Sequence, residues 1–296
     1  MYQCRFSYCS DSDYRHEFVS AMTDFANNMK GVDTTKVEVD DDDQAPPEIA
    51  LGSTEEAELM QELDMALASS GIKEKWEAFR SKSKFKELPL WCLRGRKYDV
   101  QRAAELLAKL IDAIEELQVE SGDAKHLSDH LGTHKILATG TKDARGRPII
   151  WVRLRYHDPK VYPAIELGKL VAAVMLHVLR DPDAQRLGVV ICNDMTGLKL
   201  KNLDPGAPKV LFGKVLSNLP IRVGRICIFN PPWVVGHIVL PIMMTFMSSK
   251  LKSRIAVLNG SKVENLTKYF PRESLPQELG GTTSVDSQQF IQSVVS

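Results

Sequence analysis

The stretch ICIFNPPWVVGHIVLPIMMTFMSS, residues 226–249, carries no formally charged side chain. Arg222 and Arg225 precede it, and Lys250 and Arg254 follow it. A helix that spans a bilayer needs roughly 20 continuous apolar residues. Three prolines and a glycine interrupt this run, and proline inside a helix breaks or kinks it. We therefore do not expect this stretch to cross a membrane.

The uncharged stretch divides at its Asn-Pro-Pro segment into two expected elements. Residues 226–229 are typical of a buried strand, and residues 233–247 of a short helix. Both faces of that helix are apolar at 100° per residue. One stripe consists of Val235, Val239, Ile242 and Phe246, and the nearly opposite stripe of Trp233, Leu240, Met244 and Met247. Such a helix is either enclosed in a core or a movable cover between an apolar ligand and a bilayer.

The composition limits the class of protein. With 296 residues, 44% hydrophobic, the chain can bury a substantial core. Its 38 basic and 38 acidic side chains show no basic excess, so we expect no nucleic-acid partner. The N-terminal residues lack a secretory signal, and the five scattered cysteines suit reduced thiols. We expect a monomeric cytoplasmic protein.

The polarity pattern divides the chain into three regions. Residues 1–52 contain an aspartate run at 40–43 and are expected to form a disordered acidic tail or linker. Residues 53–132 are expected to be a helical module. Ser53 and Glu56 form a capping box there, and Asp99 precedes a strongly amphipathic helix. Its apolar face consists of Ala103, Leu106, Leu107, Leu110, Ile111, Ile114 and Leu117.

Residues 133–296 alternate apolar strands with helices, which predicts an α/β fold. A hairpin joins the strands at 135–138 and 149–154, and further strands are expected at 187–192, 225–229 and 254–258. Helices are expected at 163–180 and 208–218. Continuous apolar strands that alternate with helices form a mainly parallel sheet that is covered by helices on both faces.

The sequence shows no recognisable catalytic motif, and we expect no enzyme activity, cofactor or metal. The spacing of His126, His130 and His134 would place three imidazoles on one face of a helix, but Gly132 is expected to end that helix first. Cys192 ends a buried strand, where α/β active sites often lie, yet no base accompanies it. We interpret Cys192 as a core residue.

Basic residues gather around the uncharged stretch. Lys250 and Arg254 lie one helical turn apart, Arg222 precedes the strand at 226–229, and Arg94 and Arg96 form a further cluster. Such charges often only solvate a surface. Beside an apolar helix they also suit anionic lipid headgroups, which contribute about 1 kcal/mol per cation.

Five segments together resemble the CRAL-TRIO family of lipid-binding domains. They are the arginine-rich Arg94–Asp99, the D-x-x-G-R-P turn Asp143–Pro148, the strand-end D-x-x-G at Asp194–Gly197, the N-x-P-W turn Asn230–Trp233, and the L-P-x-E-x-G-G terminator Leu275–Gly281. Leu219–Arg222 resembles the branch that contains the α-tocopherol transfer protein and the cellular retinaldehyde-binding protein. This segment lacks the glutamate that binds inositol headgroups in the phosphatidylinositol branch.

The resemblance implies a non-enzymatic pocket with the sheet as its floor and a gate helix at 233–249 as its cover. Element position suggests these lining residues: Leu211, Val215, Leu219, Ile221, Ile226, Ile228, Val235, Val239, Ile242 and Phe246. The family's phosphoinositide patch corresponds to Arg94, Arg96, Arg222, Lys250 and Arg254. The gate lacks the family's Lys-Pro-Phe, and its Pro241 is unusual.

The leading hypothesis is therefore a carrier that binds a tocopherol-, retinoid- or phospholipid-like molecule. It would release that molecule at an anionic, phosphoinositide-containing membrane with which it associates peripherally. The alternative is a regulatory scaffold that uses the same fold to recruit a protein partner.

Overall fold

A computed structural model describes most of the chain. The described residues are 49–233, 249–258, 266–267, 269–284 and 287–296, together with Ser20, Thr23, Asp24, Asn27, Val235, Gly236, Leu240, Met244 and Met247. Most of the expected acidic tail at 1–52 lies outside these residues, as does most of the expected gate helix.

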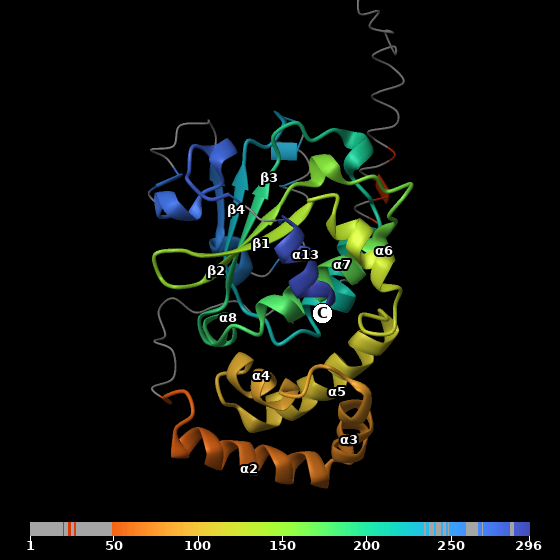
Figure 1. Cartoon of the computed structure of the whole chain (residues 1–296), viewed down its shortest axis with the longest axis vertical. Coiled ribbons are helices and arrows are strands. Elements are labelled where there is room, and N and C mark those ends of the chain that lie inside the picture. The colour runs from red at the N-terminus through yellow and green to blue at the C-terminus, as the bar shows by residue number, and fades with distance from the viewer. Residues whose placement is uncertain are drawn as a thin grey trace, which may run out of the picture.

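Helices α2–α5 gather at one end of the molecule, and the sheet lies at the other (Figure 1). Their bounds are α2 Thr54–Ser69, α3 Ile72–Lys82, α4 Leu88–Gly95 and α5 Val100–Glu116, and α6 Ala124–Leu131 leads to the sheet. The two expected N-caps are confirmed, but the reciprocal half of the expected capping box is not, because the Glu56 carboxylate accepts from the Gly52 amide and the Ser53 amide donates to Ala50. The Ser53 side chain accepts a hydrogen bond from the Glu56 amide, and Asp99 accepts one from the Arg102 amide.

The amphipathic face of α5 is confirmed in full. All seven of its expected apolar side chains are buried, because α5 packs against α2, α3 and α4. Helix α4 was not expected from the sequence. Pro89 in its first turn and the tertiary contact with α5 account for this short helix.

The sheet has five strands in the order β1-β2-β3-β4-β5. Strand β1 pairs with β2 in an antiparallel hairpin, and the remaining neighbours are parallel. The expected mainly parallel α/β sheet is thus confirmed. The strands are β1 Ile136–Lys142, β2 Pro148–Val152, β3 Val189–Asp194, β4 Val223–Phe229 and β5 Ile255–Leu258.

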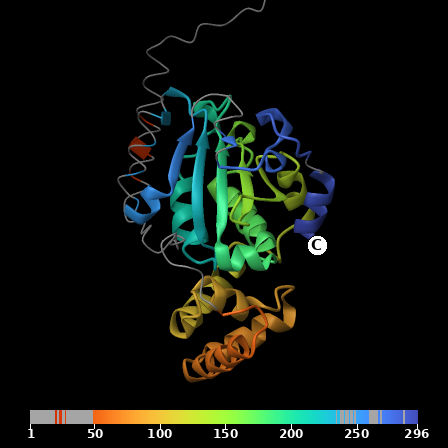
Figure 2. The same ribbon diagram turned by 90° about the vertical axis from the view of Figure 1, so that its left-hand side faces the viewer.

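Helices cover the sheet and its β1 edge. Helix α7 and the segment α9–η4 pack together, and α13 lies beside β1, at the edge opposite β5 (Figure 2). The single helix expected at 208–218 is instead one α-helical turn, α9, followed by a π-helical segment, η4. The bounds are α7 Ala164–Val178, α9 Ala207–Val210, η4 Leu211–Leu216 and α13 Ser287–Val295.

Short elements complete the described fold. They are η2 Leu154–Tyr156, α8 Pro182–Leu187, η3 Leu200–Asn202, α11 Ser249–Ser253, η6 Arg272–Ser274 and η7 Gln277–Leu279. Within the described ranges, no helix combines the length and hydropathy that a membrane crossing would need.

Candidate functional site

One face of the sheet forms an apolar floor because alternate side chains of each strand point to the same side. The strand register aligns these side chains in rungs across the sheet. One rung consists of Ile150, Ile191, Ile226 and Ile255, and the next of Ile136, Val152, Asn193 and Ile228. The opposite face carries Trp151 and Phe229, which stack with centroids 5.6 Å apart.

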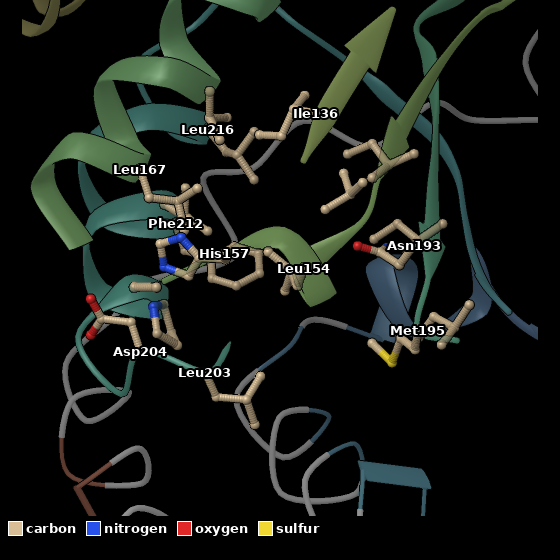
Figure 3. A pocket seen from close by; sticks show the side chains of 18 of the residues that line it. Ile136, Leu154, His157, Leu167, Asn193, Met195, Leu203, Asp204, Phe212 and Leu216 are labelled. Carbon is tan, nitrogen blue, oxygen red and sulfur yellow. The ribbon is translucent and has the colours of Figure 1, made fainter. Parts of the chain in front are cut away.

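A cavity of about 270 Å³ lies on this floor. Helix α7 contributes one face to its wall, and α9–η4 contributes a second wall (Figure 3). The wall residues are Leu167, Val171, Val174 and Met175 of α7, and Ala207, Pro208, Leu211, Phe212 and Leu216 of α9–η4. The spacing of the α7 residues, i, i+4, i+7 and i+8, is that of one helical face.

Four described residues of the expected gate region line the cavity: Val235, Leu240, Met244 and Met247. Three of these belong to the stripe that contains Trp233, whereas Trp233 itself is 67% exposed. Both expected stripes therefore contribute to the lining.

The other expected lining residues have three outcomes. Leu211, Ile226, Ile228 and Val235 line the cavity. Val239, Ile242 and Phe246 lie outside the described residues. Val215, Leu219 and Ile221 are buried in the core and are not among the lining residues.

Packing explains why these three core residues do not reach the cavity. The Val215 side chain points toward α7 at Gly168, where a methyl group would come within 3.7 Å of it. The segment around Pro220 lies against α4, since a Cβ on Gly95 would stand 2.5 Å from the Pro220 carbonyl oxygen. Helix α4 therefore covers this loop.

Sequence reasoning missed the α7 wall and the floor residues of β2 and β3. A signal for the α7 wall was present, because its lining residues recur at helical spacing. In β2 and β3 the side chains alternate between the two faces of the sheet, but both sets are mainly apolar. The sequence therefore does not indicate which face of these strands lines a cavity.

The lining is almost entirely apolar. Among the described residues its polar side chains are His157, Asn193, Asn202 and Asp204. Asn202 donates a hydrogen bond to the His157 carbonyl oxygen at 2.8 Å. Such a surface binds apolar molecules through burial and offers few groups for chemistry.

The five expected docking cations occupy different environments. Arg94 is buried and makes two hydrogen bonds to the Glu56 carboxylate, at 2.7 and 2.8 Å. Arg96 and Arg222 are also buried, whereas Lys250 is exposed and Arg254 half-buried. The five residues thus do not form one continuous exposed surface.

The family-like motifs hold turns at the ends of the strands. Asp143 receives the Arg147 guanidinium at 2.7 Å in a buried ion pair, and Arg155 binds Asp194 at 2.5 Å. Asn230 has a φ of 46°, and its side-chain amide donates to the Thr196 hydroxyl. These polar contacts place the ends of β3 and β4 beside the cavity.

Two of the three spaced histidines, His126 and His130, lie near each other with ring centroids 6.4 Å apart, and the third does not join them. His126 contacts Glu166 at 3.0 Å, His130 stacks on Tyr162, and His134 lies beyond the end of α6 with a φ of 58°. The described part of the chain contains no cluster of three or more acidic, histidine or cysteine side chains that could hold a metal. Cys192 is fully buried, and burial raises the pKa of its thiol.

Fold and cavity together define a class: an α/β domain with a helical N-terminal module and an apolar cavity on its sheet. The CRAL/TRIO domain model matches residues 132–281, which is just over half of the chain. The chain belongs to this family.

Relatives from animals and plants support the assignment. The chain is 28% identical over 195 residues to the alpha-tocopherol transfer protein-like protein of Mus musculus, covering 64% of this chain and 56% of that protein. It is 27% identical over 203 residues to tyrosine-protein phosphatase non-receptor type 9 of Homo sapiens (66% and 32%) and 25% identical over 218 residues to Patellin-4 of Arabidopsis thaliana (69% and 39%). The matches thus span little more than half of these relatives, or less.

Proposed function

We propose that this protein binds a small hydrophobic lipid in the cavity and transfers or presents it at membranes, without catalysis. The observation that carries the proposal is the cavity on the sheet, which has an isoleucine floor and almost no polar lining. Burial of apolar ligand surface contributes about 25 cal/mol per Å². Such a cavity can therefore hold a lipid while the protein crosses water.

The size of the cavity favours a compact ligand. A volume of about 270 Å³ lies just below the range of ligand pockets, roughly 300–1,000 Å³. A single-chain or ring-containing lipid, such as a tocopherol- or retinoid-like molecule, fits this volume better than a phospholipid with two acyl chains.

Helix α11 supports a docking site beside the cavity. Its Leu251 is buried and lines the cavity, whereas Lys250 and Lys252 are exposed on the same short helix. Anionic headgroups, phosphoinositides among them, attract such cations. The docking residues that we propose are Lys250 and the half-buried Arg254, which directly follows α11, and contact with a membrane would act on a helix that lines the cavity.

The binding proposal is tested by identifying the lipid that accompanies the purified full-length chain by mass spectrometry. That lipid is then offered in labelled donor vesicles with unlabelled acceptors. We expect a stoichiometric apolar lipid and protein-accelerated transfer. Purification without a lipid, no accelerated transfer and a co-purifying protein partner would overturn the carrier function in favour of the scaffold alternative.

The docking proposal is tested by charge reversal in K250E/R254E. We expect binding to phosphatidylinositol-phosphate vesicles to weaken by about 2 kcal/mol, or roughly 30-fold. R102E/K109E is the matched control, because it reverses one arginine and one lysine that are exposed on α5 in the helical module. An equal loss in both variants would show that only net charge matters and would remove the docking site.

A further inference from the structure

Asn193 places a polar side chain on the apolar floor of the cavity. It lies in β3 between Val152 and Ile228, its register partners in the two neighbouring strands. Because side chains alternate along a strand, Asn193 points to the same face of the sheet as Ile191, two residues earlier. Both residues line the cavity, and Figure 3 shows the Asn193 carboxamide directed toward Leu154. The strand therefore aims this group into the cavity.

The Asn193 carboxamide can be reached by a molecule in the cavity. The residue is half-buried, and its Oδ1 and Nδ2 atoms have no hydrogen-bond partner among the described residues. Neither atom is shielded from a water-sized molecule. Strands β2 and β4 flank the residue, so its accessible side is the side that faces the cavity. A ligand there can contact both polar atoms.

The other polar side chains of the described lining already have partners. Asn202 donates to the His157 carbonyl oxygen at 2.8 Å, and its own side-chain oxygen accepts from the Lys199 amide at 3.0 Å. Asp204 Oδ1 accepts from the backbone amide two residues later, at 2.8 Å. His157 Nδ1 lies 3.3 Å from the Lys135 ammonium, and its Nε2 is shielded from water-sized molecules. Among the described lining residues, the floor carboxamide is thus the polar side chain without any partner.

We propose that Asn193 binds a hydroxyl group of the lipid and thereby selects a neutral alcohol over a pure hydrocarbon. A carboxamide contains an acceptor oxygen and an N–H₂ donor, and a hydroxyl both donates and accepts, so each group can satisfy the other. The inference rests on the proposed lipid-binding function and adds the polar group of the ligand.

The charges of the lining disfavour an ionised ligand. No lysine or arginine is among the described lining residues, whereas the Asp204 carboxylate is. A carboxylate that enters an apolar cavity loses its hydration and would find no cation there. A hydrocarbon also loses binding, because it removes the Asn193 carboxamide from water and leaves its donor and acceptor unpaired.

The ligand class is tested with three probes of equal chain length: a long-chain primary alcohol, the n-alkane and the carboxylic acid. Each is radiolabelled in phosphatidylcholine vesicles, and its transfer to the full-length protein is measured at equilibrium near pH 7. We expect uptake of the alcohol to exceed that of the alkane, relative to their vesicle partitioning, by about tenfold. The acid should be taken up less than the alcohol.

The residue is tested with N193L, which keeps the number of heavy atoms and removes both polar atoms. We expect N193L to lose the preference for alcohol over alkane, to retain alkane uptake and to melt no lower than wild type. N193S, which keeps a smaller hydroxyl, should retain part of the preference. N218L is the matched control, because Asn218 is half-buried outside the cavity, where it donates to the Lys214 carbonyl oxygen.

The outcomes separate the hydrogen bond from the lipid-binding function. A preference for alcohol that persists in N193L, or that N218L loses to the same extent, would overturn the assignment to Asn193. Equal uptake of alcohol and alkane by wild type, or greater uptake of the acid, would overturn the proposed ligand class even if N193L did not fold. Uptake of none of the probes would overturn the lipid-binding function itself.

Discussion

At the scale of single residues, the Glu56 carboxylate shows how strongly one buried group can be held. It accepts hydrogen bonds from Arg94 Nε and Nη2, from the Tyr98 hydroxyl at 2.8 Å and from the Gly52 amide at 2.7 Å. Arg94 also donates to Gln185 of α8, at 2.7 Å. The arginine of the family-like motif thus ties the first helix of the module to the sheet domain.

Replacing Arg94 by methionine should destabilise the protein by about 3–5 kcal/mol, because it leaves the Glu56 carboxylate buried without its cation. Urea unfolding measures the change. K75M is the control, since Lys75 pairs with Asp112 at 2.6 Å while both side chains are more than a third exposed. Exposed pairs contribute at most about 1 kcal/mol. Equal losses in the two variants would contradict the structural role of Arg94.

The acid stability of the protein should depend on Glu56. Hydrogen bonds from Arg94 lower its pKa from 4.5 to about 2 in the folded state. A lowered pKa stabilises the fold above the unfolded value of 4.5, and this contribution is lost as the pH falls toward 2. The shift corresponds to about 3 kcal/mol. We expect wild type to lose more stability than E56Q between these pH values, as measured by urea titrations; parallel curves would refute the role of Glu56.

At the scale of elements, the terminator at 275–281 depends on a close backbone approach. A Cβ atom on Gly281 would lie 1.9 Å from the Leu275 carbonyl oxygen, and Gly280 has a φ of 79°. The Gly281 amide donates to the Pro276 carbonyl oxygen, and Glu278 binds Arg153 at 2.5 Å beside β2. Residues 275–281 therefore form a tight loop, called the clasp below, whose close backbone contact requires glycine at position 281.

The G281A variant should lose about 2 kcal/mol or more of folding free energy, because the added methyl group would displace backbone atoms. G213A is the matched control. Gly213 lies in η4, and a Cβ atom added there would meet no atom outside the local helix within 4 Å. Alanine restricts the unfolded chain more than glycine does, so G213A should leave the free energy of unfolding unchanged or raise it by up to about 1 kcal/mol. Thermal melts of the two variants would contradict the clasp if they coincided.

At the scale of the whole molecule, the cavity links ligand binding to stability. A lipid that binds only the folded protein adds about 2.7 kcal/mol to the free energy of unfolding at 100 times its Kd. We expect the melting temperature to rise with the concentration of the lipid that co-purifies. I191W should abolish that rise, because Ile191 lies on the cavity floor in β3, the strand between β2 and β4, and the larger tryptophan side chain would take the place of the ligand. A rise that persists in I191W would place the ligand elsewhere.

Much of the architecture could be predicted because it depends on local patterns. The buried face of α5, the two helix caps and the order of apolar strands follow from spacings of two to four residues. The switch from α9 to the π-helical η4 could not be predicted, because the apolar residues of this segment suit either helix type.

The sequence by itself determined the longer helices, the strands of the parallel sheet and the family, since these depend on periodicity and short motifs. Only the tertiary structure decided which apolar side chains line the cavity and which, like Val215 and Ile221, fill the core. It also decided that Arg94 meets Glu56, 38 residues away, and that Lys135 faces His157. The physical reason is that burial and charge pairing depend on contacts between distant segments, which local sequence spacing does not encode.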